Sequence, residues 1–265
     1  MTPPQMMKIA TWNVNGIKAR LNTALQWLTQ TQPDVACLQE IKSTDETFPI
    51  DVFEDAGYNV QIHGQKGFNG VALMSKFPLS DIRRGLPGGD DDQQSRYIEA
   101  LVMGPGTPFR IASIYLPNGN PLKTDKFLYK LGWMERLEHH AKRLLEAEEC
   151  TVLAGDFNII PEPLDCYEPE AWLDDALFQS ESRVAFRTLK NLGFTDALRS
   201  CNPNHKVYTF WDYQAGAWQK NNGIRIDHLM LSPQAADRLT SSGVDKYMRG
   251  QEKPSDHVPV YAEFA

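Results

Sequence analysis

Residues 151–158, TVLAGDFN, join a strand-like run to two side chains that could take part in catalysis. Small and apolar residues precede Asp156, Phe157 and Asn158, and a short apolar run bounded by turn residues predicts a buried strand. Side chains alternate along a strand, so Asp156 and Asn158 should point to one side and Phe157 to the other. Because α/β sheets bind ligands beyond the carboxyl ends of their strands, the pair is placed for catalysis. Taken alone, however, a solvated turn is the simpler interpretation.

Other predicted strands also end in polar side chains. Strands are expected at residues 8–12, 34–38, 109–116, 224–231 and 258–264. The polar residues that lie within, end or precede these strands, together with the first pair, are Asn13, Glu40, Tyr115, Asp156, Asn158, Asp227, Asp256 and His257. Each of them alone is more simply explained as a structural residue than as a catalytic one. As a set they are difficult to explain by packing, since buried carboxylates need partners or a metal ion.

The residue types in this set favour one of three chemistries. A Ser-His-Asp hydrolase would need a GxSxG nucleophile turn, and the sequence contains none. A zinc site would need His and Cys spacings such as HExxH, and these do not occur either. Oxygen-rich ligands with one histidine suit a hard cation, Mg²⁺ or Mn²⁺, and the chemistry of phosphate esters.

The predicted elements form one folding unit. Short strands at 59–62 and 71–75, separated by glycines, indicate antiparallel hairpins. The longest helical pattern covers residues 125–148, and its expected inward side chains are Phe127, Leu128, Leu131, Met134, Leu137, Leu144 and Leu145. The candidate polar residues extend from position 13 to position 257, so they can meet only if the whole chain folds together. We therefore predict a single domain over residues 1–265, with residues 1–7 as a disordered N-terminal extension.

The composition is that of an ordinary globular protein with an acidic balance. Of the 265 residues, 42% are hydrophobic and 23% are charged, and no apolar run is long enough to span a membrane. The cysteines show no CxxC spacing, which favours reduced thiols and a cytoplasmic protein. A net charge of −7 argues against a generally basic surface for nucleic acids. A phosphate polymer as substrate would therefore require a metal ion and a local basic patch.

Several sequence blocks resemble a known superfamily. TWNVNGIKAR, LQEIK, YLPNG, GDFNI, RIDHLMLS and KPSDHVPV are similar to the signature blocks of the endonuclease/exonuclease/phosphatase superfamily. HGQKGFNGVAL and FWDY make the resemblance closest to the bacterial exonuclease III branch of apurinic/apyrimidinic endonucleases. The similarity covers residues 8–264, except that residues 163–182 contain no recognisable motif. It implies a four-layer α/β sandwich, in which two mixed β-sheets pack face to face with helices outside and the site at one end.

The resemblance also implies roles for the carboxylates and amides. Glu40 resembles the metal ligand, and Asp256 and Asn13 are further candidates for contact with the metal ion. Asp156 resembles the residue that activates the attacking water. Asn13 and Asn158 would hold this carboxylate and the phosphate by amide hydrogen bonds.

The phosphate itself is expected to meet a second group of residues. His257 resembles a phosphate-contacting imidazole that Asp227 orients and keeps protonated. Tyr115 and Asn118 would also contact the scissile phosphate. Whether Asp156, Tyr115 or His257 takes the proton of the water stays open, because coupled groups share their titrations.

Selection of DNA is expected to depend on residues beside this centre. By the same resemblance, Phe210, Trp211 and Ile224 match a pocket for a flipped, base-free sugar, although Trp211 is equally typical of a core residue. Arg96 matches a position that clamps a phosphate or inserts into the strand. The lysines that could line the path of the backbone are Lys42, Lys123 and Lys126.

The leading hypothesis is thus a Mg²⁺-dependent DNA-repair phosphodiesterase, with Mn²⁺ as a substitute, that cleaves 5′ to abasic sites. It implies 3′–5′ exonuclease and 3′-phosphatase or phosphodiesterase activity as well. The expected partner is double-stranded DNA with abasic sites or 3′ ends, bound by a cytoplasmic monomer without membrane contact. One alternative is a phosphatase or phosphodiesterase for lipid or inositol phosphates. A non-catalytic nucleic-acid-binding module is the other, but it would be expected to lack Glu40, Asp156 or His257.

Overall fold

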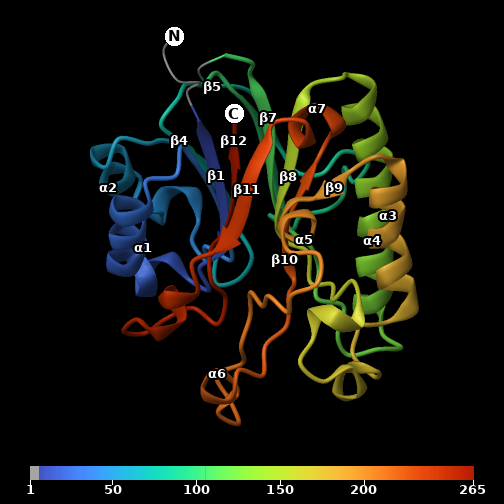
Figure 1. The fold of residues 1–265 in the computed structure, drawn as a ribbon. Helices are drawn as coiled ribbons and strands as arrows, with labels where there is room; N and C mark the ends of the chain where they lie inside the picture. The colour runs from blue at the N-terminus through green and yellow to red at the C-terminus, as the bar shows by residue number, and fades with distance from the viewer. Residues whose placement is uncertain (1–5, 105) are drawn as a thin grey trace.

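The computed structural model describes residues 6–104 and 106–265. It contains two six-stranded sheets packed face to face, with helices on both outer sides (Figure 1). The expected four-layer α/β sandwich is therefore confirmed. Of the expected N-terminal extension, residues 1–5 lie outside the described residues, whereas Met7 already belongs to the first strand.

The first sheet contains strands from both ends of the chain. Its order is β11 (Leu239–Val244), β12 (Val260–Phe264), β1 (Met7–Asn13), β2 (Val35–Gln39), β4 (Val71–Ser75) and β3 (Asn59–His63). Strands β1 and β2 are parallel, and the other neighbours are antiparallel. The register pairs Asn13 with Gln39, so β1 and β2 end at the same edge, and Glu40 follows there.

The second sheet repeats this arrangement. Its order is β5 (Leu79–Arg84), β6 (Tyr97–Val102), β7 (Phe109–Tyr115), β8 (Cys150–Asp156), β10 (Asp227–Leu231) and β9 (Thr195–Asp196). Parallel pairing of β7 with β8 places Tyr115 beside Asp156, and antiparallel pairing with β10 places Asp227 on its other side. Gly155 permits the close approach of β7, because a Cβ there would lie 1.9 Å from the carbonyl oxygen of Ile114.

Helices cover the outer faces of both sheets. α1 (Ile17–Thr31) and α2 (Ile50–Asp55) lie outside the first sheet, and α3 (Asp125–Glu146) and α4 (Ser180–Leu192) outside the second (Figure 1). The shorter helical segments are η1 (Asp45–Thr47), η2 (Pro163–Asp165), η3 (Pro169–Trp172), α5 (Ala197–Cys201), α6 (Ala217–Lys220), α7 (Pro233–Ala236) and η4 (Lys246–Gly250). The loop that carries α6 projects from the body of the molecule.

Side chains alternate in direction along the strands, and the apolar ones fill three layers of the core. Ile9 and Val152 belong to the cluster between the two sheets. Their neighbours Ala10 and Leu153 point the other way, Ala10 toward the cluster under α1 and α2 and Leu153 toward the cluster under α3 and α4. Each central strand is thus apolar on both sides, which leaves its carboxyl end as the place for polar residues.

The buried face of α3 differs from the expected one. Its buried residues are Lys130, Trp133, Met134, Leu137, His140, Ala141 and Leu144. Leu128 was expected to point inward, but 66% of its surface is exposed. Lys130 therefore continues the buried stripe of α3 toward the N-terminus of the helix. The pattern of apolar residues alone does not reveal this.

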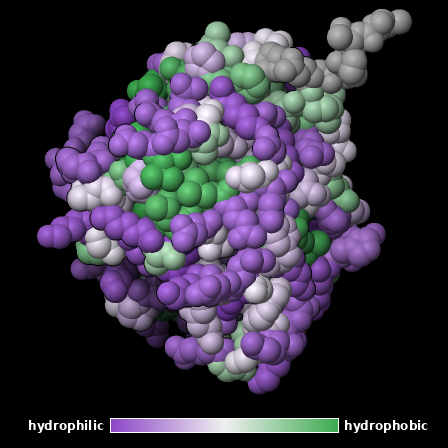
Figure 2. All heavy atoms as spheres, turned by 90° about the vertical axis from the view of Figure 1, so that its left-hand side faces the viewer, coloured by the Kyte–Doolittle hydropathy of each residue, from purple (hydrophilic) through white to green (hydrophobic). Residues whose placement is uncertain are grey.

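Figure 2 shows the face of the molecule that α1 and α2 cover. This face is largely hydrophilic, with an apolar area near its centre among the polar residues. The partly buried apolar side chains of these two helices that pack on the core beneath them are Leu21, Leu25 and Ile50. Within residues 6–104 and 106–265, no helix combines the length and apolar character needed to cross a bilayer.

Candidate active site

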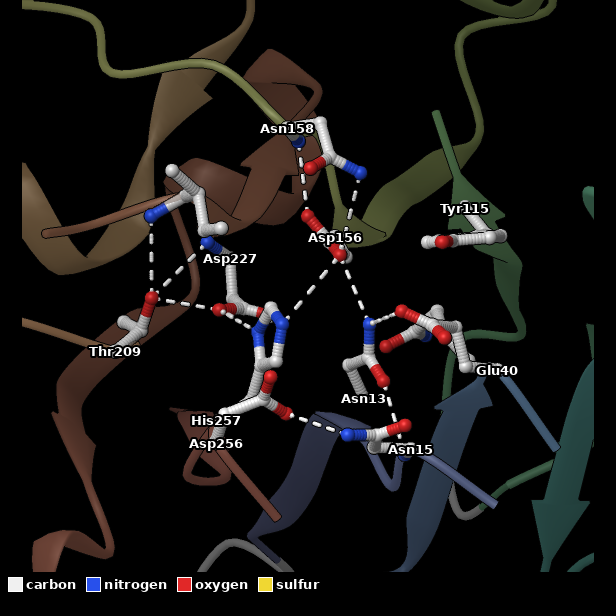
Figure 3. A network of polar contacts seen from close by, with 12 residues as sticks. Asn13, Asn15, Glu40, Tyr115, Asp156, Asn158, Thr209, Asp227, Asp256 and His257 are labelled. Carbon is white, nitrogen blue, oxygen red and sulfur yellow. Dashed lines mark hydrogen bonds and ion pairs between the residues drawn. The ribbon is translucent and has the colours of Figure 1, made fainter. Parts of the chain in front are cut away.

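Strand ends from both sheets meet at one edge of the molecule (Figure 3). Asn13 ends β1 and Glu40 follows β2 in the first sheet, while Asp156 ends β8 and Asp227 begins β10 in the second. His257 lies shortly before β12 and reaches into the same group. The structure thus brings together residues that are separated by more than half of the sequence.

Asn13 joins the two carboxylates of the group. Its buried Nδ2 donates to Glu40 Oε1 and to Asp156 Oδ2, each at 2.9 Å. Its Oδ1 accepts the backbone N–H of Asn15 at 3.0 Å, which holds the amide in this orientation. One amide therefore fixes a carboxylate from each sheet.

Asp227 orients the imidazole of His257. His257 Nδ1 donates to Asp227 Oδ2 at 2.9 Å, and the carboxylate also accepts a bond from Thr209 Oγ1 at 2.6 Å. His257 Nε2 consequently faces the centre of the group and lies 3.7 Å from Asp156 Oδ2. Thr209 has no counterpart among the expected residues, but it precedes the FWDY block by one position.

The match to a family profile identifies this arrangement. The profile described as Endonuclease/Exonuclease/phosphatase family matches residues 10–257, which include every member of the group. The chain belongs to the endonuclease/exonuclease/phosphatase family. It contains Glu40, Asp156 and His257, whose absence was expected of a non-catalytic member.

Similar proteins match nearly the whole chain. Exodeoxyribonuclease III of Haemophilus influenzae is 35% identical over 97% of this chain and 100% of its own. An AP endonuclease of Archaeoglobus fulgidus has a TM-score of 0.92 at 37% identity, covering 97% of this chain and 99% of that one. The 3′ phosphatase NExo from Neisseria, solved with a product DNA hairpin, has a TM-score of 0.93 at 39% identity, covering 98% and 99%. The resemblance to the exonuclease III branch is confirmed.

Four residues at the site have left-handed backbone conformations. Asn15 (φ 48°), Glu40 (φ 47°), Lys42 (φ 51°) and Asn158 (φ 48°) all have positive φ. Residues other than glycine rarely adopt this conformation, and it persists where surrounding contacts hold it. It turns the side chains of these four residues out of the direction that a continuing strand would give them.

Burial and neighbouring charges shift the pKa values of the central pair. Burial raises the pKa of Asp156, His257 lowers it and Asp227 raises it again, with a result of about 7. Burial lowers the pKa of His257, but the carboxylates of Asp227 and Asp156 raise it to about 10. His257 is therefore an imidazolium at neutral pH, whereas Asp156 keeps its proton to a higher pH than a free carboxyl does.

A divalent cation fits this group on chemical grounds. Ligand atoms of Glu40, Asp156 and His257 lie within 4.8 Å of one another. Burial is the main cause of the raised pKa of Asp156, and it outweighs the positive charge that His257 supplies. Lys42 Nζ lies 3.0 Å from Glu40 Oε2 and provides one charge nearby. Asp256, another expected metal ligand, lies outside this group of three, and its Oδ1 accepts a bond from Asn15.

Asn158 and Asn118 form the side of the site on the second sheet. The backbone N–H of Asn158 donates to Asp156 Oδ1 at 2.9 Å, and its Nδ2 donates to the carbonyl of Leu116 at 2.9 Å. Asn118 Nδ2 donates to Asn158 Oδ1 at 3.2 Å. Burial and the nearby carboxylates raise the pKa of Tyr115 well above its usual range, so Tyr115 stays a neutral phenol.

An apolar wall stands beside His257, but Trp211 is not part of it. The ring centroid of Phe210 lies 5.0 Å from that of His257, and Phe210 pairs with Ile224 in an isolated β-bridge. Trp211 is fully buried in the cluster under α1 and α2, with Nε1 bonded to Asn221. The expectation that Trp211 contacts substrate is therefore corrected, because successive side chains point to opposite sides. Ile224 and Ile226, which was not expected, are also buried and pack behind Phe210, so Phe210 alone of the three expected pocket residues is partly exposed.

Residues 163–182, for which the sequence offers no motif, complete the same wall. The buried side chains that they contribute to the cluster with Ile224 are Cys166, Leu177 and Phe178. Asp165 anchors the segment, because its Oδ1 accepts a bond from Arg225 Nε at 2.7 Å. Arg225 Nη1 also donates to Asp196 Oδ2 at 2.7 Å, so a buried ion network fixes the wall from behind.

Expected basic residues lie on two sides of the site. Arg96 stacks on Tyr115, with its Cζ 4.8 Å from the ring centroid, and lines a groove of about 750 Å³ together with Asn118 and Lys126. Lys42 instead bonds to Asn15 Oδ1 at 2.5 Å and pairs with Glu40. Lys123 is exposed in the loop before α3. The sites of DNA contact for these side chains stay predictions.

The Asp227–His257 pair should act as one unit. Asp227→Asn removes the charge that raises the pKa of His257, so the imidazole should lose its proton at lower pH in the variant. Relative to the wild type, the activity of Asp227→Asn should therefore fall as the pH rises from 6 toward 9. In a double-mutant cycle with His257→Asn, each single loss should approach the double loss. Fully additive losses, or a ratio that does not change with pH, would contradict the pairing.

Proposed function

We propose that this chain is a DNA-repair phosphodiesterase that uses Mg²⁺, or Mn²⁺ in its place, and cleaves the backbone 5′ to abasic sites. On duplex ends it acts as a 3′–5′ exonuclease and a 3′-phosphatase. The observation that carries this proposal is the convergence of Glu40, Asp156 and His257 within 4.8 Å at an edge shared by both sheets. Oxygen ligands beside one imidazolium suit a hard cation and a phosphate. The names of the exodeoxyribonuclease, AP endonuclease and 3′ phosphatase relatives support it.

Asp156 is the proposed acceptor of the proton from the attacking water. The water oxygen forms a bond to phosphorus as the bond from phosphorus to the leaving 3′-oxygen breaks. A pKa of about 7 suits a general base near neutral pH. The bonds from Asn13 and from the backbone of Asn158 hold the carboxylate in one orientation. Tyr115 is left as a hydrogen-bond donor, since its raised pKa excludes a phenolate at neutral pH.

His257 is the proposed electrostatic partner of the phosphate. With Nδ1 held by Asp227, its Nε2–H can donate to a phosphate oxygen on which negative charge develops. Glu40 would hold the divalent cation, which when bound supplies positive charge to the phosphate oxygens, and Asp156 stays free to accept the proton. Asn118 and Asn158 would donate amide hydrogen bonds to the same phosphate.

Phe210 and Arg96 should affect DNA selection differently. Phe210→Ala removes the phenyl ring beside His257 and leaves space there for a base. The preference for abasic over intact duplex should therefore fall by about tenfold or more. Arg96→Ala should weaken binding of both duplexes alike and lower the log–log salt slope by about one. Binding and cleavage of paired abasic and intact duplexes across a salt series measure both effects.

The matched control for this comparison is Arg187→Ala on α4, which removes the same charge from an arginine with 51% of its side chain exposed. It should leave both the preference and the salt slope unchanged. If Arg96→Ala alters the abasic preference while Phe210→Ala does not, the assignment of wall and clamp is reversed.

A second candidate function is hydrolysis of lipid or inositol phosphates by the same site. We test the two functions with a duplex that contains one abasic site, a duplex with a 3′-phosphate, inositol phosphates and vesicles that contain phosphoinositides. The proposed function predicts Mg²⁺-dependent reaction of both duplexes and no release of phosphate from the other substrates. Faster turnover of the inositol or lipid phosphates would assign the site to the alternative. Action as a cytoplasmic monomer stays a prediction, and size-exclusion chromatography with light scattering tests the monomer.

A further inference from the structure

Lys130 is a buried lysine that the proposed mechanism leaves unused. It lies in α3 at the end of the apolar stripe formed by Trp133, Met134 and Leu137, and its side chain is fully buried. Within the described part of the chain, no carboxylate lies within ion-pair distance of its amino group. Burial of a lysine is unfavourable, so its retention at an apolar position requires specific contacts.

The contacts of Lys130 are with the backbone of the active-site loops. Its Nζ donates to the carbonyl oxygen of Asn158 at 2.6 Å and to that of Asn118 at 3.0 Å. These two loops follow different strands, β8 and β7, and their asparagine side chains bond to each other. One amino group therefore joins both loops from behind the site.

The backbone around Lys130 is shaped to receive it. Asn158 has a left-handed conformation, which turns its carbonyl away from the direction of β8. Gly119 also has a positive φ of 88°, and a Cβ at Gly119 would lie 2.6 Å from Cδ of Lys130. A side chain at Gly119 would thus displace the lysine stem. This packing explains why a glycine follows Asn118.

We infer that Lys130 is a positioning residue that holds Asn118 and Asn158 in the geometry required for phosphodiester hydrolysis. The inference rests on the proposed function, because it assigns a role within that reaction. Without the amino group, two buried carbonyl oxygens lose their donor, and a buried polar group without a partner is unfavourable. The loops then shift to find other donors, and the amide groups of Asn118 and Asn158 move with them.

This role does not depend on the charge of Lys130. Burial lowers the pKa of Lys130 to about 7, while Asp175 and Asp156 raise it in part. An ammonium group has three N–H donors, and a neutral amine still has two. Both forms can therefore satisfy the two carbonyls.

Lys130→Met provides the test, because methionine fills similar space without a donor. The substrate is a 5′-labelled duplex with one abasic site and Mg²⁺, and enzyme is in excess over DNA. At saturating enzyme the single-turnover rate constant reports on the folded molecules that bind DNA, and circular dichroism gives the folded fraction of each variant separately. We expect the rate constant to fall by about 10- to 100-fold, which is typical of displaced positioning groups. The dissociation constant for DNA should stay within about twofold, because remote contacts dominate binding.

Lys142→Met is the matched control on the same helix. Lys142 has 46% of its side chain exposed and pairs with Glu138 in the preceding turn. The control makes the same substitution at an exposed position and should keep the wild-type rate constant. Lys130→Gln keeps two N–H donors on a shorter side chain and adds an acceptor oxygen, so it should fall between the wild type and Lys130→Met.

Each outcome decides the inference. A wild-type rate constant in folded Lys130→Met, or a loss that appears only in DNA binding, would overturn it. Failure of both Lys130 variants to fold would also overturn it, because the residue would then serve stability alone. A wild-type protein that does not cleave the duplex contradicts the proposed function itself, and this result is distinct from wild-type cleavage with an unaffected Lys130→Met.

Discussion

Asp156→Asn is expected to lower the single-turnover rate of incision at an abasic site by about 10²- to 10⁴-fold, the usual contribution of a general base. The substitution keeps the shape of the side chain but removes the carboxylate that accepts the proton. The amide has one acceptor oxygen, so it keeps only one of the two bonds that Asp156 accepts from Asn13 Nδ2 and from the backbone N–H of Asn158, and an unchanged dissociation constant for DNA would show that the neighbouring loops keep their positions. Rate constants and DNA dissociation constants of variant and wild type, measured in the same Mg²⁺ buffer, give the result.

Asp174→Asn is a suitable control for this experiment. Asp174 is exposed in the segment before α4 and is not among the residues of the polar network drawn in Figure 3. It should leave the rate constant unchanged. If Asp156→Asn keeps more than about one tenth of the wild-type rate, Asp156 is not the general base.

Glu40→Gln is expected to reduce both activity and the affinity for Mg²⁺. The substitution keeps the size of the side chain and removes the charge that a hard dication prefers. The rate at low Mg²⁺ should fall by about 10²-fold or more, with partial recovery at high Mg²⁺, as for other losses of metal contacts. Thermal unfolding gives a second readout, because Mg²⁺ that binds only the folded state raises Tm. This rise should be present in the wild type and lost or displaced to higher Mg²⁺ in Glu40→Gln.

Glu54→Gln on α2 provides the control for the loss of a glutamate charge. Glu54 is exposed on α2 and is not among the residues labelled in Figure 3. Its variant should keep the wild-type response of both rate and Tm to Mg²⁺. An unchanged Mg²⁺ requirement in Glu40→Gln would remove Glu40 from the metal site.

The strand ends of the site could be predicted because their signals are local. An apolar run that stops at Asp156, with Phe157 between two polar residues, indicates both the strand and the side on which each residue lies. The structure agrees, since Phe157 is fully buried under α3 and α4 and Asp156 faces the site. Sheet register then brings Tyr115 and Asp227 beside Asp156 without further information.

The residues that the sequence did not reveal depend on tertiary contacts. A lysine in an amphipathic helix is normally exposed, so Lys130 gives no local sign that two loop carbonyls face it. Trp211 was ambiguous because a large aromatic residue suits a core and a pocket equally, and only its direction decides between them. Arg225 and Asp165 are 60 positions apart, and their buried pairing cannot be inferred from either residue alone. Strand β11 has little apolar character and was not expected; its pairing with β12 defines it.

The most direct test of the account is the end group left at an abasic site. The substrate is a 5′-labelled duplex with one such site, and the wild type and Asp156→Asn are each incubated with Mg²⁺ and with EDTA. Hydrolysis at this centre predicts a labelled fragment with a 3′-hydroxyl, formed by the wild type with Mg²⁺ and strongly reduced in EDTA and in the variant. A fragment with a 3′-unsaturated aldehyde, which elimination produces, or equal cleavage by the wild type in EDTA would contradict the account.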